Sequence, residues 1–383
     1  MELDQELFNQ MKDTVARFVR ERLVPAEDEV EKTNEVPEEI VQEMRDMGLF
    51  GLSIPSEYGG LGLNMRQECE IIHELCQASL SFRSVIGTTV GIGSQGLVMT
   101  GTEEQKKEYL PRLASGEISS SFCLTEPGAG SDAASLRTTA IKDGDEYVLN
   151  GTKRYITNAL RAGMLTVMAR TNPDKKGASG VSAFLVGPNT PGITIAKADD
   201  KMGQRGTKTS DVIFEDVRVP ASTLLGGEEG QGFYTAMRVL DRGRLHLSSV
   251  ATGISERILN EGLQYAAERE QFGKPIGTFQ LVQAMLADSQ ADLYAGKCMT
   301  LDAADAFDAG EDISMKAACC KMFTTEASGR IADKAVQIHG GAGYMSEYKV
   351  ERFYRDVRLL RLYEGTTQIQ QLVIARKMLE SVN

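Results

Sequence analysis

One acidic residue near the carboxyl end of the chain stands where it could act as a general base. Glu364 follows a mostly apolar run, residues 359–363, and precedes Gly365. If that run is buried, the carboxylate loses hydration, and desolvation raises a glutamate pKa towards the range in which a general base works. Gly365 would let the backbone pass close to a bound molecule. The segment therefore predicts proton abstraction from a bound substrate.

The same segment also has a purely structural interpretation. Thr366 or Thr367 would cap a helix over residues 368–376, because threonine side chains accept hydrogen bonds from the free N–H groups of a first helical turn. The two interpretations are compatible, since a base held at the start of a helix is a rigid base.

Composition and charge limit the class of protein. The chain has 383 residues, enough for two or three domains, and a formal net charge of −12. The acidic excess argues against nucleic acid and against an anionic membrane surface as partners, and no apolar run is long enough to predict a membrane span. Six cysteines without a CxxC pair and only three histidines favour a reducing, cytoplasmic compartment and no metal site.

Hydrophobic periodicity divides the chain into three parts, and the predicted class is α+β multidomain. Helical patterns fill residues 1–120, where Pro25 and Pro111 are expected to end two helices. Short alternating runs separated by Gly, Asn and Asp over residues 121–232 predict an antiparallel sandwich or barrel. Helical patterns of bundle length return over residues 233–383. We take these three ranges as the predicted domains.

Four further segments could hold a ligand, and each also has an ordinary structural interpretation. Residues 125–132 follow a predicted strand, and their small side chains would let backbone amides approach a planar or phosphorylated group, although a plain turn explains them equally well. Residues 150–158 read as a hairpin turn and residues 269–275 as a helix C-cap. His339, before two glycines, could contact a ligand or serve the fold.

The order of these motifs along the whole chain resembles that of the acyl-CoA dehydrogenase family. The resemblance covers residues 1–383 and rests on separated motifs from residue 122 to residue 368. It implies the acyl-CoA dehydrogenase fold, with an N-terminal α-helical domain, a middle antiparallel β domain and a C-terminal four-helix bundle. It further implies a homotetramer, FAD bound between the β domain and the bundle, and electron-transferring flavoprotein as the electron acceptor.

The resemblance also assigns cofactor contacts to residues of this chain. In similar enzymes the position of Thr125 hydrogen-bonds the flavin ring, and residues 155–157 lie against the isoalloxazine with Thr157 near N5. Many members carry Trp at the position of Tyr155, so the stacking contact differs here. The residues placed at FAD, some of them reaching it from a neighbouring subunit, are Phe122, Leu124, Thr125, Gly130, Ser131, Tyr155, Ile156, Thr157, Arg269, Gln271, Phe272, Gln337, Gly341, Thr366 and Gln368.

Glu364 matches the family's catalytic base. In similar enzymes this acid removes the α-proton of an acyl-CoA thioester while a hydride passes to flavin N5, which yields the trans-2-enoyl-CoA. Hydrogen bonds to the thioester carbonyl, one of them from the backbone amide of Glu364, stabilise the developing enolate. Some members carry the base where this chain has Gly243, which cannot serve. The residues that match substrate contacts are Arg83, Ser131, Asp241, Arg244, Tyr363 and Gly365.

Arg83 carries the substrate hypothesis. Glutaryl-CoA dehydrogenases resemble the chain at this position, where their arginine binds the terminal carboxylate of the substrate. Because an Arg–carboxylate pair in a pocket of low dielectric would select an ω-acid, we expect a dicarboxylyl-CoA of glutaryl to adipyl length. Cys76 stands near the position where decarboxylating relatives carry an additional acid, so the sequence leaves decarboxylation open.

Several alternatives stay open at this stage. Arg83 could pair with Glu74 or another acid, and the enzyme would then be a short- or medium-chain acyl-CoA dehydrogenase acting on straight chains. An acyl-CoA oxidase or a desulfinase would share the fold, although the intact segment 363–366 disfavours a desulfinase. A non-catalytic, flavin-free helical scaffold is the third class, and the glycines and hydroxyls of the flavin motifs argue against it.

Overall fold

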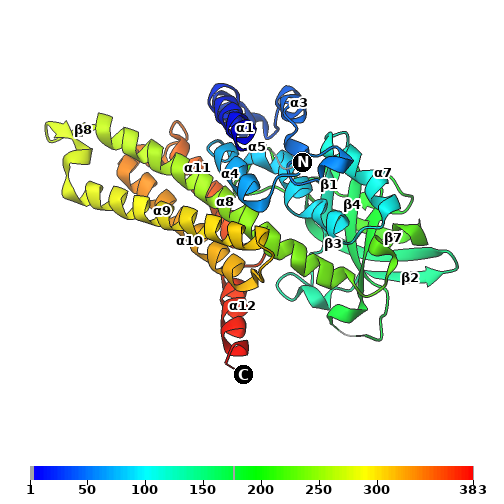
Figure 1. Ribbon diagram of the computed structural model, residues 1–383. Helices are drawn as coiled ribbons and strands as arrows, with labels where there is room; N and C mark the ends of the chain where they lie inside the picture. The colour runs from blue at the N-terminus through cyan, green and yellow to red at the C-terminus, as the bar shows by residue number, and fades with distance from the viewer. Residues whose placement is uncertain (1–3, 176, 383) are drawn as a thin grey trace.

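The first part of the chain is helical. The computed structural model describes residues 4–175 and 177–382. Figure 1 shows the N-terminal helices in blue and cyan at the top of the molecule, between the long C-terminal helices and the sheet. The helices are α1 (Gln5–Phe18), α2 (Val24–Thr33), α3 (Glu38–Asp46), α4 (Met65–Leu75), α5 (Leu80–Gly87), α6 (Gln95–Thr100) and α7 (Glu103–Ala114).

The expectation that Pro25 and Pro111 end helices is wrong. A π-helical turn over Val19–Leu23, in which the N–H of Val24 donates to the carbonyl of Val19, joins α1 to α2, so the chain stays helical through Pro25 in the first turn of α2. Pro111 lies inside the last turn of α7, whose side chains Leu110 and Leu113 are completely buried. Tertiary packing of this turn therefore outweighs the hydrogen bond that the proline removes.

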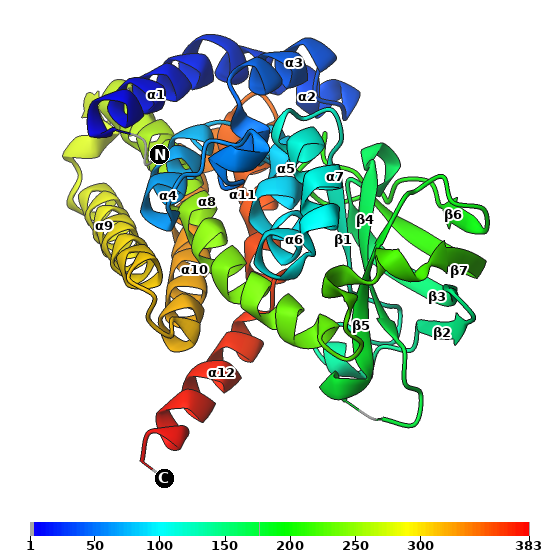
Figure 2. The same cartoon turned by 45° about the vertical axis from the view of Figure 1, so that its right-hand side comes forward.

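The middle of the chain forms one seven-stranded sheet with the strand order β1-β4-β2-β3-β7-β6, and β5 pairs with β4. Most pairs are antiparallel, as predicted, but β1 and β2 both run parallel to β4. Figure 2 shows the sheet at the right of the molecule. The strands are β1 (Ser120–Cys123), β2 (Thr139–Asp143), β3 (Glu146–Thr157), β4 (Met164–Arg170), β5 (Val181–Val186), β6 (Ile193–Ile195) and β7 (Thr209–Pro220).

The last part is again helical, and its three longest helices pack side by side. A short hairpin of β8 (Glu270–Gln271) and β9 (Lys274–Pro275) stands at the far tip of the first of them, and the last helix projects away from the others (Figure 1). In the described residues, no helix is long and apolar enough to cross a membrane. The helices are α8 (Gly232–Glu268), α9 (Gln280–Asp308), α10 (Ser314–His339), α11 (Lys349–Val357) and α12 (Thr367–Glu380).

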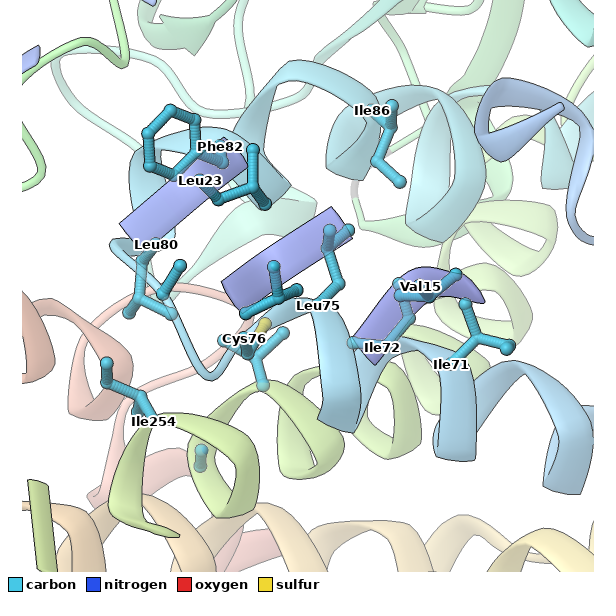
Figure 3. Close-up of a cluster of buried hydrophobic side chains, with 14 of the residues drawn as sticks. Val15, Leu23, Ile71, Ile72, Leu75, Cys76, Leu80, Phe82, Ile86 and Ile254 are labelled. Carbon is cyan, nitrogen blue, oxygen red and sulfur yellow. The ribbon is translucent and has the colours of Figure 1, made fainter. Parts of the chain in front are cut away.

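One hydrophobic core joins the two helical parts. Figure 3 shows Val15 of α1 beside Ile71 and Ile72 of α4, and Ile254 of α8 below Leu80 of α5; all belong to one core cluster. A separate core lies within the sheet and includes Tyr147 and Phe184, whose rings meet edge to face at 5.0 Å. Because α8 is shared by the helical core and the contact with the sheet, it fixes the two parts against each other. The predicted borders at 120/121 and 232/233 stay predictions.

Candidate active site

A cavity of about 360 Å³ lies where the three parts of the chain meet. Its wall includes α5, the loop after β1, the end of β3, residues 201–209, the first half of α8 and the segment that precedes α12. Segments almost 300 residues apart in the sequence thus face one space. The predicted site residues that line it are Arg83, Phe122, Leu124, Thr125, Gly130, Ser131, Tyr155, Thr157, Arg244, Tyr363, Glu364 and Gly365.

The other predicted site residues do not line this cavity. Ile156 points into the core of the sheet, and Asp241 on α8 pairs with Arg244 and accepts a hydrogen bond from Ser314 at 2.7 Å. Thr366 stands at the start of α12. The residues exposed on the single chain, several of them at or beside the β8–β9 hairpin, are Arg269, Gln271, Phe272, Gln337, Gly341 and Gln368.

Glu364 stands in a tight turn just before α12. Its φ is +54°, a left-handed conformation that is uncommon for a residue other than glycine, and the φ of Gly365 is +89°. Thr366 caps α12 by accepting a hydrogen bond from the N–H of Ile369, whereas the hydroxyl of Thr367 donates to Glu326. The capping interpretation is therefore confirmed for Thr366, and the same turn carries the acid.

The carboxyl group of Glu364 is poorly solvated. Its Oε2 is inaccessible to solvent and has no hydrogen-bond partner among the described residues. Burial raises the pKa of Glu364, and the positive charges of Arg83, Lys321 and Arg244 act in the opposite direction. An unpaired carboxyl group with a raised pKa is a stronger base once ionised, and the three cations favour its ionised form.

Gly243 on α8 faces this carboxyl group. A Cβ atom at position 243 would lie 2.7 Å from the Oε2 of Glu364 and 3.1 Å from the Cγ2 of Ile92. Any side chain at position 243 would therefore press on the acid. The geometry agrees with the sequence argument that the acid at 364 and a side chain at 243 exclude each other.

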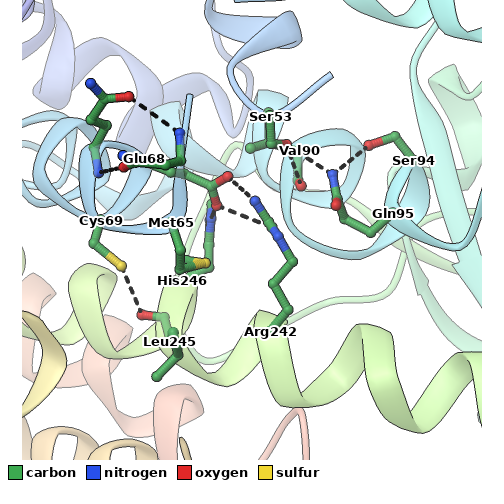
Figure 4. Close-up of polar contacts among 12 residues, drawn as sticks. Ser53, Met65, Glu68, Cys69, Val90, Ser94, Gln95, Arg242, Leu245 and His246 are labelled. Carbon is green, nitrogen blue, oxygen red and sulfur yellow. Dashed lines mark hydrogen bonds and ion pairs between the residues drawn. The ribbon is translucent and has the colours of Figure 1, made fainter. Parts of the chain in front are cut away.

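Arg83 is held by a buried chain of hydrogen bonds that begins at its Nε atom. The Nε of Arg83 donates to the Nε2 of His246 at 3.0 Å, and the Nδ1 of His246 lies 2.7 Å from the Oε1 of Glu68. Glu68 also pairs with Arg242 (Figure 4). Since arginine always keeps its proton, His246 must accept at Nε2 and carry its hydrogen on Nδ1.

Electrostatics keeps the hydrogen-bonded series Arg83, His246 and Glu68 in one protonation state. Burial, helped by the positive charge of Arg83, lowers the pKa of His246 to about 4, so the ring is neutral. Burial alone would raise the pKa of Glu68, but Arg242 and His246 hold it at about 2. The arrangement leaves the two terminal nitrogens of Arg83 without a hydrogen-bond partner in the described residues. The alternative pairing of Arg83 with Glu74 is wrong, because Arg83 donates to His246 and, in the described residues, makes no hydrogen bond or ion pair with Glu74.

The loop after β1 is anchored by buried contacts to the sheet, and its other face is open to the cavity. Glu126 accepts hydrogen bonds from the N–H groups of Arg137 and Thr138 and pairs with Lys153 at 2.8 Å; the Nζ of Lys153 also donates to the carbonyl of Leu124. Across the described residues, the N–H groups of Thr125, Gly130 and Ser131 have no partner, and a Cβ at Gly130 would meet nothing within 4 Å. The loop therefore presents free donors and open space to a ligand.

Family comparisons identify the chain. It matches the acyl-CoA dehydrogenase N-terminal domain over residues 5–117, the middle domain over residues 121–217 and the C-terminal domain over residues 230–379. The chain belongs to the acyl-CoA dehydrogenase family. It is therefore an oxidoreductase that acts on acyl-CoA, with the helical, β and helical domains expected from the sequence.

Relatives and solved structures cover nearly the whole chain. This acyl-CoA dehydrogenase is 40% identical over 369 residues to an acyl-CoA dehydrogenase of Bacillus subtilis, which spans 96% of this chain and 97% of that protein. It is 41% identical over 374 residues to subunit CarC of a caffeyl-CoA reductase-Etf complex of Acetobacterium woodii, which spans 97% and 98%.

Two solved structures have nearly the same fold. Butyryl-CoA dehydrogenase from Megasphaera elsdenii has a TM-score of 0.94 at 34% identity and covers 99% of this chain and 100% of that one. Glutaryl-coenzyme A dehydrogenase in its glutaryl-CoA complex has a TM-score of 0.93 at 33% identity and covers 99% and 96%.

The cofactor of this acyl-CoA dehydrogenase is FAD, as for the family. The cavity fits such a group, because the free N–H donors of Thr125, Gly130 and Ser131 suit the acceptor atoms of a flavin ring. A bulge in β3 gives Tyr155 a φ of +57° and leaves its ring 60% exposed at the cavity, with the guanidinium of Arg154 4.6 Å from the ring centre. An aromatic surface and a row of donors thus face the same space.

Removing Lys153 is expected to destabilise the cofactor loop. Lys153→Met leaves the buried Glu126 without its cation, and breaking one side of a buried pair costs about 3 kcal/mol of unfolding free energy. Adding Glu126→Gln should restore much of the loss, because neither charge then remains buried. Thermal or urea unfolding measures both changes. Arg218→Met, which breaks an exposed pair with Glu146, is the control and should cost less than about 1 kcal/mol.

Sequence reasoning missed part of the cavity wall, including Lys201 and Gln204, and two residues behind that wall. Gln204 lines the cavity with a φ of +50°, and its N–H donates to Asp356; nothing in the local sequence indicates this. Lys321 and Gln370 both donate to the carbonyl of Gly365. Lys321 had a usable signal, since it is the one charged residue in the apolar and small run 317–323 of the sequence.

Proposed function

We propose that this enzyme oxidises the Cα–Cβ bond of a CoA thioester whose acyl chain ends in a carboxylate, with Glu364 as the base. The observation that carries the proposal is the unpaired, desolvated carboxyl group of Glu364 in the wall of the cofactor cavity. A carboxylate that has lost its hydration and gained no hydrogen bond is a stronger base than one in water. No other acid lines the cavity besides Asp132, which accepts a hydrogen bond from Ser135, among the residues that the structure describes.

The turn at residue 364 supplies a second group. The N–H of Glu364 has no hydrogen-bond partner in the described part of the chain, so it is free to donate to the thioester carbonyl oxygen. Negative charge develops on that oxygen as the α-proton leaves, and a fixed donor stabilises it. Glu364 thus takes the proton at its side chain and stabilises the resulting charge at its backbone. Bound FAD supplies the hydride acceptor.

Arg83 supports the choice of a dicarboxylyl-CoA, glutaryl to adipyl in length. The hydrogen bond to His246 occupies only the Nε of Arg83. The two terminal nitrogens of Arg83 keep the geometry that binds a carboxylate with two parallel hydrogen bonds. The similarity to glutaryl-coenzyme A dehydrogenase supports the same choice. Cys76 is fully buried in the helical core and does not line the cavity, so the proposal does not include decarboxylation.

Arg83→Ala tests the substrate assignment. We expect the wild type to prefer glutaryl-CoA or adipyl-CoA over butyryl-CoA, and the variant to lose about a hundredfold of that preference in kcat/KM, because the carboxylate then lacks its buried partner. Turnover of butyryl-CoA should also fall, because Arg83 favours the ionised form of Glu364, but it should fall by less than turnover of the dicarboxylyl substrates. Arg238→Ala, an exposed arginine on α8, is the matched control. Equal preference for the neutral chain in wild type and variant would exclude the dicarboxylyl substrate.

Reduction of a 2-enoyl-CoA is a second candidate, favoured by the likeness to a caffeyl-CoA reductase subunit. The same residues would act in reverse, with protonated Glu364 giving its proton to Cα. Anaerobic mixing decides between the directions: oxidised enzyme is mixed with the acyl-CoA, and chemically reduced enzyme with the enoyl-CoA. A dehydrogenase is expected to be bleached rapidly in the first mixture, whereas a reductase regains its flavin absorbance rapidly in the second and bleaches little in the first.

We further propose electron-transferring flavoprotein as the electron partner and a homotetramer as the assembly. The likeness to a subunit of a reductase-Etf complex supports the first. Exposed apolar side chains support the second, since Phe272 in the β8–β9 hairpin is 93% exposed and Leu281 at the start of α9 is 83% exposed. Light scattering of the purified enzyme gives the mass of the assembly directly.

A further inference from the structure

Lys321 on α10 is a buried cation behind the wall of the cavity. Its side chain is completely shielded from solvent, and its Nζ donates to the carbonyl of Gly365 at 2.7 Å. Within the described residues, the ammonium group has no other hydrogen bond and forms no ion pair. Burying an ammonium group in this way costs several kcal/mol, so its presence needs a reason beyond packing.

The carbonyl that Lys321 binds belongs to the turn that carries the base. The Nε2 of Gln370 donates to the carbonyls of Glu364 and Gly365 at 3.1 and 3.0 Å. Both of these turn residues have positive φ, and the left-handed conformation costs about 1 kcal/mol at a glutamate. Two buried donors thus hold a strained turn from behind, on elements that are separate from the turn itself.

Lys321 also contributes charge at the base. Three cations act on Glu364, namely Arg83 from α5, Arg244 from α8 and Lys321 from α10. Burial lowers the pKa of Lys321 to about 8, with Glu364 and Glu326 opposing this and Arg244 adding to it, so the group remains mostly charged at neutral pH. The carboxylate of Glu326 is already engaged by Arg361 and Thr367.

We propose that Lys321 is a positioning residue for the base. Lys321 fixes the Gly365 carbonyl, so that Glu364 keeps its left-handed conformation and its side chain stays directed at the substrate. The positive charge of Lys321 also favours the ionised carboxylate of Glu364. The proposal rests on the proposed role of Glu364. Lys321 does not line the cavity and has no contact with substrate in this account.

Two substitutions at position 321 separate this role from simple packing. Lys321→Met keeps the length of the side chain without the donor or the charge, and Lys321→Arg keeps both. We expect Lys321→Met to retain FAD and its flavin to bleach at least about tenfold more slowly with acyl-CoA in stopped flow. A base that is displaced from the α-proton abstracts it more slowly, although substrate and FAD still bind. Lys316→Met, at a partly exposed position on the same helix, should behave as wild type.

The pH dependence of the bleaching rate distinguishes this role from a packing defect, because a packing defect would not shift it along the pH axis. Bleaching falls as the pH falls through the pKa of Glu364. Loss of a nearby cation raises that pKa. The acid limb, which is the low-pH part of the profile where the rate falls, should therefore move to higher pH in Lys321→Met. In Lys321→Arg it should return towards its position in the wild type. An acid limb that does not move in Lys321→Met, together with an unchanged rate, overturns the proposal.

Gln370→Leu tests the anchoring of the turn separately, because Lys321 and its charge stay in place. It removes an anchor of the turn but no charge, so the rate should fall without a shift of the acid limb. Because both side chains hold one carbonyl, the double variant should lose less than the product of the two single losses. Fully multiplicative losses, or a wild-type rate in Gln370→Leu, count against a shared positioning role.

Failure here is distinguishable from failure of the proposed function. If Glu364→Gln is inactive while Lys321→Met keeps the rate and limb of the wild type, the base assignment stands and the role of Lys321 is wrong. If Glu364→Gln bleaches at the rate of the wild type, the base assignment itself is wrong. FAD absorbance of each purified variant reports whether the holoenzyme has formed.

Discussion

Glu364→Gln is expected to slow bleaching of the bound flavin by acyl-CoA by at least about a hundredfold, and by up to about 10⁴-fold. Glutamine has the shape of glutamate but no basic oxygen, so binding and geometry are kept while proton abstraction is lost. The FAD content should not change, because the cofactor loop 125–131 is a separate segment of the cavity wall, whose free N–H donors the substitution leaves in place. Stopped-flow absorbance under anaerobic conditions measures the rate.

The matched control is Glu380→Gln, the same chemical change at an exposed position near the end of α12. It should bleach as fast as the wild type. A normal rate in Glu364→Gln would remove the proposed base, and a colourless protein that takes up no FAD would remove the flavin mechanism as a whole.

The same variant should be more stable than the wild type at neutral pH. Burial raises the folded-state pKa of Glu364 above its value in the unfolded chain, so ionising this acid costs stability as the pH rises through that window. Glutamine never ionises and avoids the cost. The difference in unfolding free energy should shrink as the pH is lowered towards the unfolded-state pKa of about 4.3. Activity and stability therefore oppose each other at this position.

Local sequence was sufficient for the parts of the site that depend on one short segment. The flanks of Glu364 predicted its poor solvation, and the glycines and hydroxyls of residues 125–131 predicted a ligand loop. The helix, sheet, helix order followed from periodicity, because a change from period 3.6 to period 2 is a property of neighbouring residues. Pro25 was misjudged because a π-helical turn carries the helix past it, and Pro111 because packing, which local rules omit, keeps its turn helical.

The parts that depend on contacts between distant segments could not be predicted. The chain from Arg83 through His246 to Glu68 joins α5, α8 and α4 across sequence separations of 163 and 178 residues. Nothing near Arg83 distinguishes this partner from Glu74, which lies on the preceding helix and was the plausible choice. The exposed residues Arg269, Gln271 and Phe272 are a different case, since their predicted cofactor contacts require a neighbouring subunit and stay predictions.

Gly243→Ala is expected to slow flavin bleaching by roughly a hundredfold, although it adds one methyl group and removes nothing. That methyl would stand 2.7 Å from the Oε2 of Glu364 and 3.1 Å from the Cγ2 of Ile92, both inside van der Waals contact. The carboxylate must therefore turn away from the substrate α-proton. Its turn is held by Lys321 and Gln370, so the backbone cannot follow, and the reacting atoms separate.

Gly262→Ala is the control for this prediction, because it makes the same change on the same helix, α8, where the nearest atom to the new Cβ lies at 3.7 Å. It should bleach at the rate of the wild type and gain slightly in stability, since alanine is the better helix former. If Gly243→Ala also kept the rate of the wild type, Glu364 would have room to move without losing its function, and a fixed base could not be the source of the rate.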